Sequence, residues 1–180
     1  MKNTHIAYNA YNIYSIPISF FKELKVKYVI SDLDNTLDSA YKDYPCDEAI
    51  KLKKALNEIN IELIIISNNH EERVKKYAEK LEVRYLSEAK KHHKKRIQTW
   101  LNQMNISVND AIFVGDQIFT DRIYVKKING RLILTEPLVK KDQFITRFVR
   151  WLDRLVRNNW KKKNKLGIHV GGENYVFKEK

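Results

Sequence analysis

The stretch Val29-Ile30-Ser31-Asp32-Leu33-Asp34-Asn35-Thr36-Leu37 decides how this chain folds. An apolar run from Val26 to Ile30 leads into it and predicts a buried strand of a parallel sheet. The carboxylates of Asp32 and Asp34 follow directly, and two like charges so close together require water or a cation. We interpret them as a Mg²⁺-assisted site with an aspartate nucleophile. The alternative is a solvated turn after a strand.

Four more apolar runs follow along the chain and alternate with helical patterns. They cover residues 61–66, 83–86, 111–114 and 132–134, and a last helix is expected at about 142–158. This alternation predicts the α/β class, with a parallel sheet of about five strands, right-handed crossovers and helices on both faces. We expect one three-layer domain over residues 26–160, a packed N-terminal lead-in over 1–25, and a basic, mobile tail over 161–180.

The lead-in is rich in aromatic residues. Tyr8, Tyr11 and Tyr14 recur at a spacing of three, which suggests one face of a helix packed on the domain. Residues 13–21 form a short apolar run that contains Pro17 and has no small-residue cleavage site after it. We therefore expect a structured segment and not a signal peptide.

Composition narrows the cellular setting and the partners. The single cysteine, Cys46, excludes an internal disulfide and a cysteine-based zinc cluster, and it fits a reducing cytoplasm. No apolar run approaches the length of a transmembrane helix. The net charge is +12, and the segment from Arg147 onward holds 10 basic and 3 acidic residues. Such a balance is typical of proteins that bind nucleic acid or anionic lipid.

Three of the predicted strands end in polar signatures. These are Asp32-x-Asp34, Ser67-Asn68, and Gly115-Asp116 followed by Asp121. Ligands of open α/β sheets bind at the carboxyl ends of strands, where the strand order reverses. If the first strand is central and the fourth lies beside it, four carboxylates gather in one crevice. Oxygen ligands select Mg²⁺ over zinc there, and a lysine after the third strand could hold a phosphate.

These signatures, in this order, resemble the haloacid dehalogenase superfamily of phosphohydrolases. The finer match, over about residues 8–160, is to the YqeG family of subfamily IIIA phosphatases. It is carried by four segments of the sequence: Asp32-Leu-Asp-Asn-Thr-Leu37, Ser67-Asn-Asn69, Gly115-Asp-Gln117 with Thr120-Asp121, and Phe144-Ile-Thr-Arg-Phe148.

The resemblance implies a role for each matching residue. Asp32 would attack phosphorus to form an aspartyl-phosphate, and Asp34 would act as general acid and then base, with its backbone carbonyl on Mg²⁺. Ser67 and the Asn68 backbone N–H would bind phosphate oxygens, and Thr36 would support them. The metal would be bound by Asp32, Asp34, Asp116 and, more weakly or indirectly, Asp121.

The phosphate-binding lysine is Lys90 or Lys91. Alignment of Ala89-Lys90-Lys91 favours Lys91, with His92 in place of the proline that family members tend to have. Without that proline the loop is less constrained.

The sequence leaves no room for a cap domain. Residues 37–60 hold one loop and one helix, and residues 69–90 hold one helix and one strand. We therefore expect an open site that admits a large substrate, such as a protein, a nucleic acid end or a lipid headgroup.

The last helix offers two interpretations. Its apolar residues Phe144, Phe148, Trp151, Leu152 and Leu155 share one face, and Arg147, Arg150, Arg154 and Arg157 cluster on the other. We favour packing of the apolar face on the sheet, with the arginines in water. The alternative is a helix that lies on an anionic membrane.

The YqeG family is similar to the mitochondrial phosphatidylglycerophosphatases, which implies phosphatidylglycerophosphate as the leading substrate and phospholipid biosynthesis as the role. The protein would then be cytoplasmic or peripheral on the inner face of the membrane. Two alternatives stay open: a phosphatase for nucleotide, polynucleotide or protein phosphate, and a basic RNA- or ribosome-binding protein with a vestigial site.

Overall fold

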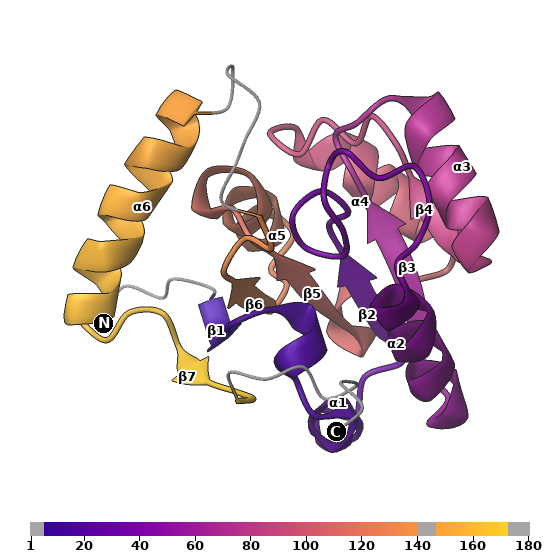
Figure 1. The fold of residues 1–180 in the computed structure, drawn as a ribbon, viewed down its shortest axis with the longest axis horizontal. Helices are drawn as coiled ribbons and strands as arrows, with labels where there is room; N and C mark the ends of the chain where they lie inside the picture. The colour runs from indigo at the N-terminus through magenta and orange to yellow at the C-terminus, as the bar shows by residue number, and fades with distance from the viewer. Residues whose placement is uncertain (1–5, 140–146, 173–180) are drawn as a thin grey trace.

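The computed structural model describes residues 6–139 and 147–172 of the chain. Seven parallel strands form one sheet in the order β4-β3-β2-β5-β6-β1-β7, which crosses the molecule in Figure 1. The strands are β1 (Ile6–Ala10), β2 (Tyr28–Ser31), β3 (Glu62–Ile66), β4 (Arg84–Leu86), β5 (Ala111–Gly115), β6 (Leu132–Thr135) and β7 (Ile168–His169).

Helices cover both faces of the sheet and complete three layers. One core, between the sheet and α1, α2 and α3, includes Val29, Leu63 and Ile65; the other, below α4, α5 and part of α6, includes Ile30, Ile64 and Phe113. The helical elements are η1 (Ile13–Ser15), α1 (Ile18–Glu23), α2 (Asp47–Glu58), α3 (Glu71–Leu81), α4 (Lys94–Gln103), η2 (Val108–Asp110), the π-helix η3 (Ile118–Arg122), α5 (Ile123–Lys127) and α6 (Arg147–Lys162).

The predicted centre of the sheet is confirmed. Strand β2 lies between β3 and β5, and Ser31 is in register with Ile65 of β3 and Val114 of β5. Consecutive residues of β2 face opposite cores, which explains why its sequence is continuously apolar. The polar residues after β2, β3 and β5 therefore meet at one edge of the sheet.

The lead-in differs from the helical prediction. Tyr8 lies in β1, Tyr11 follows it and is exposed, and Tyr14 lies in η1. The spacing of three was misleading because Ile6–Ala10 includes alanine and asparagine, which have low strand propensity, and it pairs with β6 only through tertiary contacts. Within this segment, Tyr14 and Phe21 are buried.

The segment predicted as a tail from residue 161 is partly built into the sheet. Lys161 and Lys162 end α6, and β7 pairs with β1. The Asn9 side chain donates to the carbonyl oxygens of Leu166 and Gly167, at 3.3 and 3.2 Å. Two-residue strands carry no periodicity, so the sequence gives little sign of them. Residues 173–180 lie outside the described part.

The predicted orientation of the last helix holds for Arg154, which is exposed, but is wrong for Trp151, Leu155 and Arg157. Trp151 and Leu155 of α6 are 53% and 49% exposed, whereas Arg157 is only 7% exposed. Phe144 and the side chains of Arg147, Phe148 and Arg150 lie outside the described part. The inward face is instead polar at Asp153 and Arg157, whose partners are backbone groups beside the site, and apolar at Val156 and Trp160.

The absence of a cap is confirmed for the two segments that could hold one. Residues 32–46, all described, contain neither helix nor strand beyond one isolated bridge, and only α3 lies between β3 and β4. Among the described residues, no helix combines the length and apolarity that crossing a bilayer requires.

Candidate active site

The loop after β2 is tightly folded on itself. The Asp32 N–H donates to the Val114 carbonyl at 2.9 Å, and the N–H groups of Leu37 and Asp38 both donate to the Leu33 carbonyl at 3.0 Å. Asn35 adopts the left-handed conformation, φ +65°, which asparagine tolerates better than most residues. This loop leaves the Asp32 carboxylate buried at the carboxyl edge of the sheet.

Three carboxylates converge at this edge. Oxygen atoms of Asp32, Asp116 and Asp121 lie within 4.8 Å of one another, and all three residues are buried. The Thr36 hydroxyl lies 3.5 Å from Asp116 Oδ1, so it contacts the same group. Burial raises the pKa of Asp32 well above its usual range; Lys91 opposes this, whereas the Asp121 and Asp116 carboxylates add to it.

Asp121 reaches the cluster because residue 115 is glycine. A β-carbon on Gly115 would lie 2.3 Å from Asp121 Cγ, closer than any side chain allows. Asp121 belongs to the π-helix η3, and its Oδ2 accepts the Gln117 N–H at 3.0 Å. The Gly115-Asp116 signature thus provides one carboxylate of the cluster and the space for a second one.

Lys91, and not Lys90, enters the site. Its Nζ forms a short hydrogen bond to Asp32 Oδ1 and another of 2.7 Å to Asp121 Oδ1. Lys90 is exposed and has a φ of +47°, which turns the chain just before Lys91. Burial alone would lower the pKa of Lys91, but the Asp121 and Asp32 carboxylates outweigh it and raise the pKa, so the ammonium stays charged.

The donor set fits a divalent cation. When ionised, the three carboxylates carry three negative charges in a buried space that also holds the one positive charge of Lys91. All the carboxylate donors are oxygen atoms, which suit Mg²⁺ better than softer metals. The centre of the Tyr124 ring lies 5.6 Å from Lys91 Nζ, close enough for a cation–π contact. Tyr124 belongs to the core that also includes Ile30 and Phe113.

Ser67 and Asn68 connect β3 to this cluster. The Ser67 hydroxyl accepts the Asn69 N–H at 3.0 Å, and Asn68 Oδ1 accepts the Lys91 N–H at 2.9 Å. The second bond ties the segment that carries the lysine to the end of β3. Ser67 is buried at the same sheet edge as Asp32.

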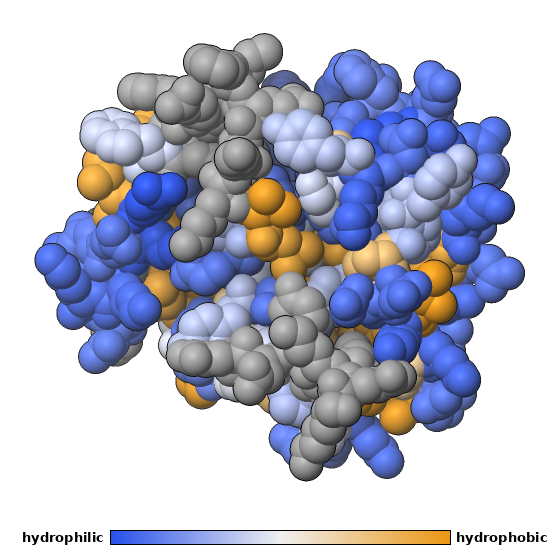
Figure 2. Space-filling view, viewed as in Figure 1, coloured by the Kyte–Doolittle hydropathy of each residue, from blue (hydrophilic) through white to orange (hydrophobic). Residues whose placement is uncertain are grey.

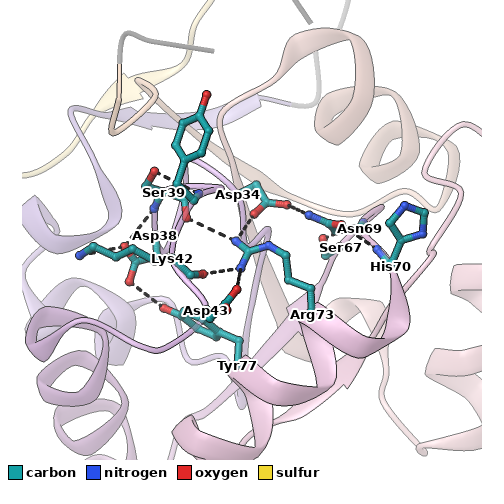
Figure 3. Close-up of polar contacts among 11 residues, drawn as sticks. Asp34, Asp38, Ser39, Lys42, Asp43, Ser67, Asn69, His70, Arg73 and Tyr77 are labelled. Carbon is teal, nitrogen blue, oxygen red and sulfur yellow. Dashed lines mark hydrogen bonds and ion pairs between the residues drawn. The ribbon is translucent and has the colours of Figure 1, made fainter. Parts of the chain in front are cut away.

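The Asp34 carboxylate points to a different set of partners, which Figure 3 shows. Asn69 Nδ2 donates to its Oδ2 at 3.0 Å, and Arg73 Nη2 donates to its Oδ1 at 2.6 Å. Asp34 therefore lies next to the Asp32 cluster along the chain but is held by residues that follow β3.

Helix α6 supports the segment that carries Asp116. Arg157 donates to the backbone carbonyls of Asp116 and Thr135 at 2.6 and 3.0 Å, and Asp153 accepts the Ile118 N–H at 2.7 Å. Both side chains are buried. Burial raises the pKa of Asp153, and the nearby Arg157 guanidinium and the Ile118 N–H oppose that shift.

The structure thus brings every sequence-predicted residue to one sheet edge. Asp32, Asp116, Asp121 and Lys91 form its buried centre. Thr36 contacts Asp116, and Asn68 contacts the backbone of Lys91. Ser67 and Asp34 lie at the same edge, but their contacts described above are with Asn69 and Arg73. The sequence did not indicate Arg73, Asp153 or Arg157, because charged residues in helices are ordinarily on the solvent face.

Two comparisons with known proteins identify the family. Residues 27–123 match the model of the haloacid dehalogenase-like hydrolases. The chain is 33% identical over 152 residues to the Bacillus subtilis (strain 168) protein named "Probable phosphatase YqeG", an alignment that covers 84% of this chain and 88% of that protein.

Among solved structures of low sequence identity, one with a TM-score above 0.5 shares the fold. An uncharacterized protein from Listeria monocytogenes serotype 4b is 14% identical, with a TM-score of 0.51 over 66% of this chain and 85% of that one. The cobalt-bound deoxy-D-mannose-octulosonate 8-phosphate phosphatase from Haemophilus influenzae is also 14% identical, with a TM-score of 0.47 over 81% and 93%. The matched residues and the Bacillus relative together establish that this chain belongs to the haloacid dehalogenase-like hydrolases, in the YqeG family of phosphatases.

Proposed function

We propose that the protein is a Mg²⁺-dependent phosphomonoester hydrolase that works through an aspartyl-phosphate on Asp32. The observation that carries this proposal is the buried cluster of Asp32, Asp116 and Asp121 with Lys91 Nζ between two of its carboxylates. The cluster combines a nucleophile, oxygen ligands for a cation and a fixed positive charge for a phosphate oxygen.

The residues of the chain account for both halves of the reaction. Asp32 attacks phosphorus, the bond to the leaving oxygen breaks, and Asp34 supplies that oxygen with a proton. A water then attacks the phosphoryl group, Asp34 takes its proton, and the Asp32 carboxylate and inorganic phosphate are released. Lys91, Ser67 and the Asn68 N–H hold the phosphoryl oxygens, and Thr36 orients Asp116.

The metal would be held by Asp32, Asp116 and the backbone carbonyl of Asp34, with Asp121 as a weaker or indirect ligand. When bound, Mg²⁺ supplies charge stabilisation to the transferring phosphoryl group.

We further propose phosphatidylglycerophosphate as the substrate, approached at an anionic membrane surface from the cytoplasmic side. The absence of a cap in the two loop segments leaves the site accessible to a headgroup. The exposed charges of residues 151–165 are all positive, because Asp153 is buried. Figure 2 shows that the surface over α6, at the left, is largely hydrophilic, with some apolar side chains toward its upper end. Each basic residue near anionic lipid contributes about 1 kcal/mol.

Phosphate release tests the chemistry and the substrate together. The purified protein with Mg²⁺ should hydrolyse p-nitrophenyl phosphate, and Asp32→Asn should not. Phosphatidylglycerophosphate should be hydrolysed orders of magnitude faster than nucleotides, phosphopeptides or 5′-phosphorylated oligonucleotides. Equal or lower rates on the lipid would remove the lipid proposal while leaving the phosphatase proposal intact.

Vesicle binding tests the membrane proposal independently of turnover. The protein should sediment with phosphatidylglycerol vesicles in a salt-sensitive way and not with phosphatidylcholine vesicles. The double variant Lys161→Glu, Lys162→Glu should weaken this binding, whereas Lys51→Glu and Lys54→Glu on the distant helix α2 should change it much less. Stronger binding to RNA than to anionic vesicles would favour the nucleic-acid alternative.

A further inference from the structure

Arg73, near the start of α3, contacts both the Asp34 carboxylate and the loop that follows it (Figure 3). Its Nη2 donates to Asp34 Oδ1 at 2.6 Å and to the Ser39 carbonyl at 3.3 Å, and its Nη1 donates to the Lys42 carbonyl. The side chain is only 15% exposed. One guanidinium therefore connects α3 to Asp34, just after β2, and to the loop of residues 39–42.

The helix that carries Arg73 is firmly placed. Val74 and Tyr77 are fully buried in the core below α3, and the Tyr77 hydroxyl donates to Asp38 Oδ2 at 3.2 Å. The backbone on which Arg73 sits is thus anchored both to the sheet and to the start of the loop. A side chain with this support can fix the position of its partner.

Each oxygen of the Asp34 carboxylate has its own donor. Arg73 binds Oδ1, and Asn69 Nδ2 binds Oδ2 at 3.0 Å. Two donors on two oxygens fix both the position and the rotation of a carboxylate plane. Because Arg73 also holds the Ser39 and Lys42 carbonyls, a shift of the loop would displace the guanidinium that orients Asp34.

We propose that Arg73 is a positioning residue of the phosphatase reaction, which sets the orientation of the Asp34 carboxylate and couples it to the loop of residues 39–42. The inference rests on the proposed role of Asp34 as general acid and base. It assigns no contact between Arg73 and the phosphoryl group.

A misplaced Asp34 carboxylate should slow formation of the aspartyl-phosphate more for alkyl phosphates than for aryl phosphates. Cleavage of an alkyl phosphate needs proton donation to the leaving oxygen, whereas p-nitrophenolate leaves readily without it. The parameter kcat/KM reports only the steps up to and including the first irreversible step. If release of the leaving alcohol is irreversible, these are the steps that form the aspartyl-phosphate. Loss of Arg73 should therefore lower kcat/KM selectively for alkyl phosphates.

The test compares Arg73→Ala and Arg73→Lys with wild type on glycerol 3-phosphate and p-nitrophenyl phosphate. We expect Arg73→Ala to lower kcat/KM about 100-fold on the alkyl ester and less than about 10-fold on the aryl ester. Because the water-activation step also slows, phosphorylated protein should accumulate with p-nitrophenyl phosphate. Arg73→Lys, which keeps the charge but not the forked donor, should show a smaller loss with the same selectivity.

Lys76→Ala is the matched control, since Lys76 lies on the same helix and pairs with Asp43 at 3.1 Å without contacting Asp34. It should leave both kcat/KM values near wild type. Equal losses on both substrates, or a loss with Lys76→Ala as large as with Arg73→Ala, would overturn the proposal in favour of a structural role. If Arg73→Ala does not fold, Arg73→Lys decides. Wild type inert on both esters would instead overturn the proposed function itself.

Discussion

Lys91 Nζ lies 2.7 Å from Asp121 Oδ1, and the two side chains are only 2% and 1% exposed. An ammonium so deeply buried stays charged because the carboxylates of Asp121 and Asp32 lie against it. Lys91→Met should therefore lower phosphatase activity at least about 100-fold, since a fixed charge on the phosphoryl group is lost. In EDTA it should also lower the free energy of unfolding by about 3 kcal/mol, because the carboxylates lose their partner. Steady-state kinetics and urea unfolding measure the two effects.

Lys90→Met is the control, because Lys90 is the exposed neighbour. It should retain activity within about twofold and stability within about 0.5 kcal/mol. A larger loss with Lys90→Met than with Lys91→Met would reverse the assignment of the phosphate-binding lysine.

Gly115→Ala should displace Asp121 from the carboxylate cluster, because the new β-carbon would collide with Asp121 Cγ. We expect weaker Mg²⁺ binding. In wild type, Mg²⁺ at 100 times its dissociation constant should add about 2.7 kcal/mol to the free energy of unfolding, and the variant should gain less. Thermal unfolding with and without Mg²⁺ measures the difference.

Gly172→Ala provides the comparison, since nothing lies within 4 Å of the β-carbon it would add. It should respond to Mg²⁺ as wild type does. An undiminished Mg²⁺ effect in Gly115→Ala would show that Asp121 contributes nothing to the metal site.

Arg157→Met should destabilise the protein by about 3 kcal/mol, or roughly 6 to 12 °C in Tm. It removes the Arg157 hydrogen bonds to the carbonyls of Asp116 and Thr135 and the charge beside buried Asp153, which keeps only the Ile118 N–H among the contacts described above. Arg154→Met, one turn away and exposed, should shift Tm by less than about 2 °C. Differential scanning calorimetry decides, and equal shifts for the two variants would contradict the buried role of Arg157.

The Cys46 thiol should react slowly in the folded protein, because burial raises its pKa to about 11. Alkylation by iodoacetamide at pH 8 should be at least about 10-fold slower than in denaturant, and its rate should rise until about pH 11. The unfolded chain loses this proton at lower pH, so the contribution of Cys46 to stability is complete below about pH 9 and is lost as pH rises through about 11. A folded-state rate equal to that in denaturant would contradict this environment.

The sequence predicted the parts of the site that one local pattern encodes. Asp32, Ser67 and Asp116 each follow an apolar run, and the carboxyl ends of parallel strands must share an edge, so their convergence followed from topology. The five adjacent strands β4, β3, β2, β5 and β6 were predicted in the same way, as apolar runs.

The parts that were missed depend on tertiary contacts between distant segments. Strands β1 and β7 hold little apolar periodicity; β1 pairs with the edge of β6, and β7 pairs with the outer edge of β1. Arg157 was predicted to face water because helical amphipathicity assigns charge to the outside. In the structure Arg157 donates to the backbone carbonyls of Asp116 and Thr135. The amphipathic pattern of a helix does not show which backbone groups elsewhere in the chain require a donor.

Detection of the covalent intermediate decides whether Asp32 is the nucleophile. Wild-type protein mixed with Mg²⁺ and p-nitrophenyl phosphate, quenched in acid and digested, should carry a phosphoryl group on the peptide that contains Asp32, as measured by mass spectrometry. The adduct should be absent from Asp32→Asn and from wild type in EDTA. Rapid phosphate release without any adduct at Asp32, or with an undiminished adduct in Asp32→Asn, would contradict the account.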